Sequence, residues 1–350
     1  MFRPQAEPIS ICGMIAIYFK KGHFSERWLE YCIKQKIPYK LVNPYSSDIV
    51  SQLVGCSYFM WHFDHMEYKD SLFAKQLIQS IELKGIIVFP NFFTCWHFND
   101  KVGQKYLLES INAPLVPTQI FYDKKSALNW TESTSFPKVF KLRGGSGSLN
   151  VKIIKDKATA KKLIKQAFRR GFPLFNNFTV FNERLRKYRL GKASGQSVVK
   201  WFLAIFLGPI ITQQYGRERG YFYCQEFIPN NSFDIRVVVI GPRAFAIKRM
   251  VRRNDFRASG SGFIVYDKNQ IDIKCVQISF DMHSKLKAQV LAYDFVFDSQ
   301  NNPLIVEISF GYNMEAYDLC EGYWDKNLEW YEGYYKHEYW IVDLLLGNLK

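Results

Sequence analysis

The apolar positions of the first ninety residues follow two different periods. Short apolar runs typical of strands occupy residues 13–19, 38–42, 57–63 and 85–91. Between them, two segments repeat their apolar side chains every three or four positions, as amphipathic helices do, and these are residues 25–36 and 70–83. Strands that alternate with helices predict a parallel α/β sheet. No GxGxxG follows the first strand, which argues against a dinucleotide site there.

Further along the chain, strands dominate the pattern. Asn99 and Asp100 are typical helix N-cap residues before a helix over 101–110. Residues 118–168 predict a strand, a glycine-rich tip, a second strand and a helix. More strands are predicted at residues 221–228, 234–241, 243–251, 262–267, 291–298 and 303–311, with a helix near 282–291.

Composition places the chain among globular proteins. It has 350 residues, and 48% of them are apolar, which is enough for two or three units around a sizeable core. No window reaches the roughly 18 to 20 unbroken apolar residues of a membrane span. The N-terminus lacks the pattern of a secretory signal, and the seven cysteines form no CxxC pair. We therefore expect reduced thiols and a cytoplasmic location.

The formal net charge of +15 favours an anionic partner. A nucleotide, a nucleic acid, an acidic glycan and an anionic lipid surface all satisfy this condition, and charge alone does not choose among them. The charge is concentrated in residues 169–200, which carry eight basic side chains against the single acid Glu183. Phenylalanines lie between these basic residues.

The glycine-rich tip follows Lys141 and contains Gly144, Gly145, Ser146 and Gly147. Such a hairpin tip is either a mobile surface turn or a cradle for phosphates. It is not a Walker A loop, because no Lys-Ser or Lys-Thr pair follows the glycines at the start of a helix.

Two groups of polar residues are further candidates for chemistry. Asp294 and Glu307 lie on the two strands of a predicted hairpin, where they could share a hard cation such as Mg2+ or face solvent. His62, Asp64 and His65 follow a predicted strand. They could contact a substrate, although a pair of histidines at a strand end is more often structural.

Taken in order, these residues resemble the ATP-grasp family, and most closely its RimK-type and glutathione-synthetase-like carboxylate–amine ligases. The resemblance covers roughly residues 95–312, and its most specific part is the series QEFI, DIR, FR, the Asp of the hairpin and VEIS. It implies a Rossmann-like α/β domain over residues 1–95 and an ATP-grasp domain of two α+β subdomains over 96–312. We expect a basic insertion at 169–218 and an aromatic tail, 313–350, packed on the core.

The resemblance also implies roles for individual residues. Phosphate binding falls to Lys101, Lys141 and the loop of Gly144, Gly145, Ser146, Gly147 and Ser148. Glu226 and Phe227 correspond to the hinge beside adenine, and Asp234 to a further nucleotide contact. The catalytic arginines would be Arg236, Arg249 and Arg257. The metal ligands would be Asp294, Glu307 and Ser309, where Ser309 replaces the family's usual asparagine. The family's FRSN pattern is also altered, to Phe256-Arg257-Ala258-Ser259.

The implied activity is ATP- and Mg2+-dependent joining of a carboxylate to an amine through an acyl phosphate. The aromatic tail resembles tails of ATP-grasp proteins associated with bacterial cell-surface polysaccharides. This favours an acidic sugar, such as one in a uronic-acid-bearing glycan, as the carboxylate and an amine or amino acid as its partner. The alternatives are a ligase that adds amino acids to a protein or peptide tail and, ranked last, a nucleic-acid-binding protein, since no RNA or DNA motif is present.

The basic insertion has two interpretations. It could lie along an acidic glycan, and its apolar run, Trp201 to Ile211, could touch a lipid carrier or the inner face of the membrane. Alternatively, the insertion is a solvated lid and the apolar run is a buried helix.

Overall fold

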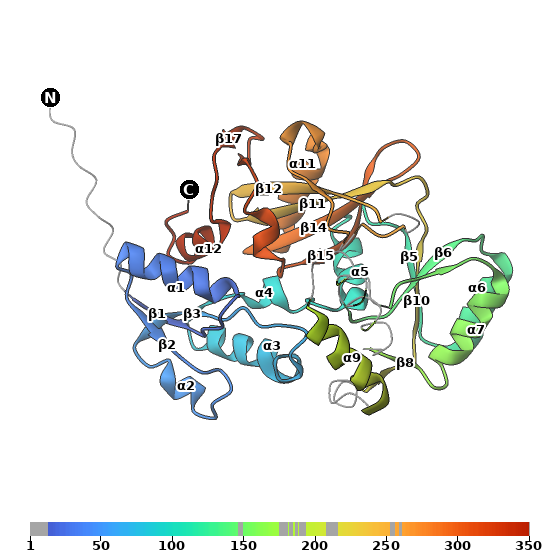
Figure 1. Ribbon diagram of the computed structural model, residues 1–350, viewed down its shortest axis with the longest axis horizontal. Coiled ribbons are helices and arrows are strands. Elements are labelled where there is room, and N and C mark those ends of the chain that lie inside the picture. Colours follow the sequence, from blue (N-terminus) through green and yellow to red (C-terminus); the bar gives the residue numbers. More distant parts are fainter. Residues whose placement is uncertain are drawn as a thin grey trace.

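The computed structural model describes most of the chain (Figure 1). The described residues are 13–145, 150–174, 181, 185, 188, 194–207, 216–252, 256–258 and 261–349. Gly144 and Gly145 of the glycine tip are therefore described, whereas Ser146, Gly147 and Ser148 lie outside the described residues. Most of the basic residues of the insertion also lie outside them.

The N-terminal part is a parallel sheet in the strand order β2-β1-β3-β4, as the alternating pattern predicts. Its strands are β1 (Met14–Ile17), β2 (Tyr39–Leu41), β3 (Cys56–Met60) and β4 (Ile87–Phe89). Its helices are α1 (Phe24–Gln35), α2 (Ile49–Gln52), α3 (Tyr68–Leu83) and α4 (Phe92–Cys95). Lys36, in the left-handed conformation, ends α1 and turns the chain toward β2.

Helix α5 (Lys101–Ser110) leads into a second, antiparallel sheet in the order β5-β10-β6-β7. Its strands are β5 (Thr118–Phe121), β6 (Lys138–Lys141), β7 (Lys152–Ile154) and β10 (Phe222–Glu226). Helices α6 (Lys124–Ser133) and α7 (Lys157–Ala167) cover its outer side (Figure 1). The sequence pattern did not predict α6, a short helix that begins at the N-cap Asp123.

The third sheet is antiparallel and has the order β15-β14-β11-β12-β16-β17, with β13 beside β12. Its strands are β11 (Phe233–Ile240), β12 (Arg243–Met250), β13 (Ile264–Val265), β14 (Val290–Phe297), β15 (Pro303–Ser309), β16 (Gly322–Asp325) and β17 (Trp330–Glu332). The helix predicted near 282–291 was wrongly placed. Helix α11 spans Ile273–Leu286 and ends because Lys287 adopts the left-handed conformation, so that β14 can begin at Val290.

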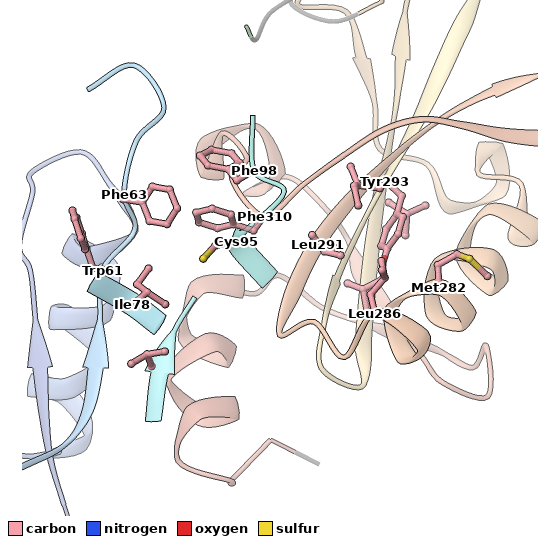
Figure 2. Close-up of a cluster of buried hydrophobic side chains, with 14 of the residues drawn as sticks. Trp61, Phe63, Ile78, Cys95, Phe98, Met282, Leu286, Leu291, Tyr293 and Phe310 are labelled. Atoms are coloured by element: carbon pink, nitrogen blue, oxygen red, sulfur yellow. The ribbon is translucent and has the colours of Figure 1, made fainter. Parts of the chain in front are cut away.

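One apolar core joins the N-terminal sheet to the third sheet. Figure 2 shows Trp61 and Phe63 on the N-terminal side of this cluster, Phe98 and Phe310 in its middle, and Tyr293 on the large sheet. The rings of Phe98 and Phe310 are 4.4 Å apart and those of Phe63 and Phe310 are 5.2 Å apart. These contacts fix the end of β15 against the loop that follows β3.

The C-terminal segment packs on both parts of the molecule. Strands β16 and β17 extend the third sheet, and α12 (His337–Leu345) lies beside α1 (Figure 1). Arg27 of α1 donates two hydrogen bonds of 2.6 Å to Asp318 and one of 2.8 Å to Glu338. Glu338 is fully buried. The tail thus ties the N-terminal helix to the large sheet.

Within the described part of the insertion, β8 (Phe172–Pro173) pairs with β9 (Arg217–Glu218), and α9 spans Gly195–Leu207. Helix α9 contains the first part of the apolar run predicted at Trp201 to Ile211 and exposes Val199 and Leu203. No helix among the described residues combines the length and the apolar character needed to cross the bilayer.

Candidate active site

A cavity of about 930 Å³ lies where the three sheets meet. Most of the site residues predicted from sequence line it. These are Lys101, Lys141, Gly145, Glu226, Phe227, Asp234, Arg236, Arg257, Asp294, Glu307 and Ser309. Gly144 and Arg249 do not line the cavity. Its size suits a nucleotide with part of a second ligand.

Lys141 ends β6 with its amino group inside the molecule. Its Nζ donates a hydrogen bond of 2.6 Å to Oε1 of Gln225, whose Nε2 in turn donates to the hydroxyl of Thr118 at 3.1 Å. Gln225 follows Tyr223, the residue opposite Lys141, by two positions on β10, so the two side chains lie on one face of the sheet. Burial lowers the pKa of Lys141 to about 8, against the raising effect of Glu307.

Lys101 is the first residue of α5, which begins at the N-cap Asp100 as predicted. Its buried amino group lies 2.9 Å from Oε1 of Glu307 and donates to the carbonyl oxygen of Gly145 at 2.8 Å. Asn99 fixes the same glycine, because its side-chain oxygen accepts from the amide of Gly145 at 2.7 Å. The base of the glycine tip is therefore held between α5 and β6, beside both lysines.

The predicted hinge residues have different surroundings. Glu226 faces Lys138 across β10 and β6, and its carboxylate accepts hydrogen bonds of 2.5 and 2.7 Å from the lysine Nζ. Phe227 packs edge-to-face on Phe256, with ring centroids 5.9 Å apart. Apolar side chains complete this wall of the cavity, namely Val116, Val139, Ile228, Val296 and Val306.

A network of two carboxylates and two guanidinium groups forms the floor of the cavity and the layer beneath it. Arg236 donates two hydrogen bonds, of 2.5 and 2.9 Å, to the carboxylate of Asp294. Arg249 donates two, of 2.6 and 2.7 Å, to the carboxylate of Asp234. A further contact of 3.1 Å joins Arg249 to Asp294. Cross-strand register explains the pairs, since Arg236 lies opposite Asp294 and Asp234 lies opposite Arg249.

The two acids of this network respond differently to burial. Burial raises the pKa of Asp234 despite the adjacent Arg249. Burial would also raise the pKa of Asp294, but Arg236 and Arg249 together hold that pKa below its usual value. Asp294 is therefore an anion at neutral pH. Arg249 positions both acids from beneath the cavity, so its predicted catalytic role stays a prediction.

Asp294 and Glu307 are directly opposite each other on β14 and β15, next to a register shift that follows Asp294. Two adjacent carboxylates suit Mg2+, which keeps several waters and takes further oxygens from substrate phosphates. No cluster of three or more His, Cys, Asp or Glu side chains that could enclose a metal occurs in the described ranges. Ser309 instead exchanges hydrogen bonds with the backbone of Gly311, at 2.8 Å to its oxygen and 3.2 Å from its amide. Its role as a metal ligand stays a prediction.

Several residues that meet at the site were not assigned to it from sequence. Gln225 and Lys138 contact predicted residues through β10 and β6, and a strand alignment with the correct register would have indicated them. Asn99 was interpreted only as a capping residue. His23, Tyr312, Asn313 and Glu315 also line the cavity, and no local sequence signal brings these distant segments together.

Part of the chain matches a known domain family, and nearly the whole chain has a fold like those of several solved structures. Residues 216–320 match the model of the RimK-like ATP-grasp domain. No curated protein matches the chain. Among solved structures, a RimK domain ATP-grasp protein from Sphaerobacter thermophilus aligns over 95% of this chain and 100% of its own, with 12% identity and a TM-score of 0.54.

Two further structures have similar folds. The D-alanine–D-alanine ligase of Bacillus anthracis, complexed with ATP, aligns over 95% of both chains with 11% identity and a TM-score of 0.55. The biotin carboxylase domain of the Hydrogenobacter thermophilus 2-oxoglutarate carboxylase, in complex with MgADP, ADP and bicarbonate, aligns over 96% of this chain and 70% of its own. The identity is 12% and the TM-score 0.58. The chain thus has the fold of the ATP-grasp ligases.

Proposed function

We propose that the protein is an ATP-dependent carboxylate–amine ligase that works through an acyl phosphate. The observation that carries this proposal is the meeting of Lys101, Lys141 and Arg236 with the facing acids Asp294 and Glu307 in one cavity. The cations would hold the phosphates of ATP, and the apolar wall beside Glu226 and Phe227 would receive adenine. Asp294 and Glu307 would hold Mg2+, which neutralises charge on the transferred phosphoryl group.

The reaction mainly requires that the protein position the reacting groups. A substrate carboxylate oxygen attacks the γ-phosphorus, and the bond to ADP breaks. The lysines and Arg236 would hold the reacting oxygens in line and offset their negative charge, a role that needs no covalent bond to the protein. An amine then displaces phosphate from the acyl carbon and forms the amide.

For the carboxylate, we propose an acidic sugar of a bacterial cell-surface polysaccharide or its precursor. The net charge of +15 and the basic insertion support an anionic polymer as substrate. The apolar residues Val199 and Leu203, exposed on α9, support contact with a lipid carrier or an anionic membrane surface. Sedimentation with phosphatidylglycerol vesicles tests that contact. A Leu203→Glu variant that sediments as well as the wild-type protein would contradict it.

A two-dimensional screen of acids against amines tests the ligase proposal. Uronic acids, amino acids and acidic peptides are each combined with amines and amino acids, and phosphate release is measured with MgATP. We expect release that requires one acid and one amine together. Glu307→Gln should abolish it, whereas Ser309→Asn, which introduces the asparagine usual in the family, should retain it. Release that needs neither substrate, or none with any pair, would contradict the proposal.

A further inference from the structure

The cavity has a second end that the ATP-binding residues do not occupy. The loops after β1 and β3 and the turn after β15 form it, and its polar residues are His23, His62, Asp64, His65, Asn313 and Glu315. We call these six residues the histidine end. Phe24, Phe63, Phe98, Tyr312 and Met314 provide its apolar walls.

This end adjoins the reacting groups. The ring of His62 lies 5.5 Å from that of Phe310, which directly follows Ser309 on β15. The ring of His65 lies 5.4 Å from that of Phe98, near the start of α5. Lys101 and Glu307 are close enough to His65 to influence its pKa, which burial lowers. A ligand at the histidine end would therefore lie beside the place where the acyl phosphate forms.

The two ends differ in their charged residues, because the ATP-binding end combines basic side chains with four carboxylates, whereas the histidine end has carboxylates alone. The Lys and Arg residues that line the cavity within the described chain are Lys101, Lys141, Arg236 and Arg257, none of which belongs to the histidine end. The histidine end instead contributes the carboxylates of Asp64 and Glu315. Lys20 approaches Asp64 from outside the cavity, at 3.9 Å. Such a surface attracts a cationic group and repels a second anion.

His62 has unused hydrogen-bonding capacity at this end. Its ring stacks on Phe24 at 4.0 Å, yet both ring nitrogens are shielded from solvent and have no hydrogen-bond partner. Burial lowers the pKa of His62 to about 3, so the imidazole is neutral and offers one donor and one acceptor. His97 and His283 are also buried without partners, but neither lines the cavity. Among these three, His62 alone lines the cavity, so a small turn of its ring would present a nitrogen to a ligand there.

The loop that carries His62 is held in place before any ligand binds. Asp70 of α3 accepts a hydrogen bond from the amide of Asp64 at 2.6 Å and another from the hydroxyl of Tyr45 at 2.5 Å. Asp64 accepts from the amide of Met66 at 2.8 Å. A preorganised polar surface loses little conformational entropy on binding.

We propose that the histidine end binds the amine substrate, with His62 hydrogen-bonded to it and Asp64 and Glu315 offsetting its positive charge. This inference rests on the ligase function proposed above. The amine nitrogen attacks the acyl carbon, the C–N bond forms, and the C–O bond to phosphate breaks with its electron pair on the oxygen. Of the two protons lost by the ammonium group, one goes to the released phosphate and one to solvent.

Steady-state kinetics of His62→Phe test the inference with the acid and amine found by the screen. Phenylalanine keeps the ring that stacks on Phe24 but removes both nitrogens. We expect the KM for the amine to rise about tenfold or more, the loss of one good hydrogen bond, while the KM values for ATP and the acid stay unchanged. His62→Asn, which restores a donor and an acceptor, should recover part of the loss. His283→Phe is the matched control.

Hydroxylamine separates this inference from the ligase proposal, because it traps an acyl phosphate as a hydroxamate without the natural amine. His283→Phe should form hydroxamate at the wild-type rate, and His62→Phe should still form it when hydroxylamine is in excess. If His62→Phe forms hydroxamate but its KM for the amine is unchanged, or its KM for the acid rises instead, the inference is wrong while the ligase proposal stands. A wild-type protein that forms no hydroxamate with any acid would overturn the ligase proposal and the inference with it.

A binding experiment on the wild-type protein tests the inference without depending on whether a variant folds. The chain has six histidines, so their side-chain nitrogens can be followed individually by NMR in the 15N-labelled protein with MgADP. Glycinamide, an amine without a carboxylate, should shift His62 and His23, and His97, His283 and His337 should stay fixed. Glycolate, a carboxylate without an amine, should leave all six unchanged. Shifts with glycolate instead, or none with glycinamide, would overturn the inference.

Discussion

Lys141 carries a buried amino group whose hydrogen-bond partner, the side-chain oxygen of Gln225, is neutral. Burial lowers the pKa of Lys141 to about 8, and a bound phosphate would raise it again by supplying negative charge. Between these two pKa values, nucleotide binding must take up a proton. The Kd for MgADP should therefore be flat below pH 8 and rise above it, by roughly tenfold per pH unit. Calorimetric titrations from pH 7 to 9.5 measure this dependence.

Two variants assign the effect to Lys141. Lys141→Arg keeps its charge throughout this range, so its Kd should no longer rise with pH. Lys141→Ala should remain folded but lose measurable nucleotide turnover. A wild-type Kd with the same pH profile as Lys141→Arg would contradict the assignment.

Variants at Asp294 and Glu307 should distinguish an effect on stability from an effect on catalysis. Asp294 accepts hydrogen bonds from Arg236 and lies 3.1 Å from Arg249, so Asp294→Asn leaves buried positive charge unbalanced. This should cost about 3–5 kcal/mol of the free energy of unfolding. Glu307 is 29% exposed and pairs with Lys101 alone among the described ion pairs, so Glu307→Gln should cost far less. Urea unfolding measures both.

Turnover should fall in both variants by about 100-fold or more, because each loses a carboxylate that Mg2+ needs. The stable Glu307→Gln protein is the informative one, since its loss of turnover is not a loss of fold. Near-normal turnover in Glu307→Gln would show that the hairpin acids do not serve a catalytic cation.

At the scale of elements, the backbone conformation of Gly145 fixes the base of the glycine tip. Gly145 has φ +113°, its carbonyl accepts from Lys101, and its amide donates to Asn99. Alanine at this position is strained by about 1–3 kcal/mol and should shift the loop base. Gly145→Ala should therefore raise the Kd for MgADP by roughly tenfold.

Gly85 provides the control. It has φ +87° in the turn between α3 and β4, and a Cβ there would meet no atom within 4 Å. Gly85→Ala carries a comparable backbone cost away from the cavity, so it should lower stability without changing the Kd. Equal Kd values for the two variants would contradict a specific role for Gly145.

The elements also show what the sequence could predict. Apolar period and capping residues predicted the four strands of the N-terminal sheet and the start of α5 at Asp100, because these signals are local. The helix near 282–291 was extended too far because Lys287 adopts the left-handed conformation, which is hard to predict for a residue other than glycine. Its start at Ile273, after the N-cap Asp272, was also missed. Helix α6 was missed because its ten residues include few apolar side chains.

At the scale of the whole molecule, the predicted site residues came from matching short motifs, and most of them line one cavity. Only the fold brings the further cavity residues, which the motifs did not indicate, to the same place. His62 and His23 meet Tyr312 and Glu315 only because Phe63, Phe98 and Phe310 join two sheets into one core. Such a meeting depends on packing between distant segments, and no sequence period encodes it.

The same packing depends on the contact between α1 and the tail, which can be tested through Arg27. Arg27 is the cation that balances Glu338, whose side chain is 1% exposed. Burial raises the pKa of Glu338, and Arg27 opposes that rise. Arg27→Ala would leave a buried carboxylate without its cation, at a cost of about 3–5 kcal/mol in the free energy of unfolding near pH 8.

The sign of the pH dependence follows from the same pair. Without Arg27, the folded-state pKa of Glu338 rises further above its unfolded value, so folding favours the protonated acid. The stability deficit of Arg27→Ala relative to the wild-type protein should therefore shrink as the pH falls from 8 to 5. Adding Glu338→Gln to Arg27→Ala removes the unbalanced charge and should recover much of the loss at pH 8 while abolishing the pH dependence. Urea unfolding of the wild-type protein and these two variants at both pH values measures each effect. A deficit that stays constant with pH would mean that Asp318, rather than Glu338, is the partner through which Arg27 ties α1 to the tail.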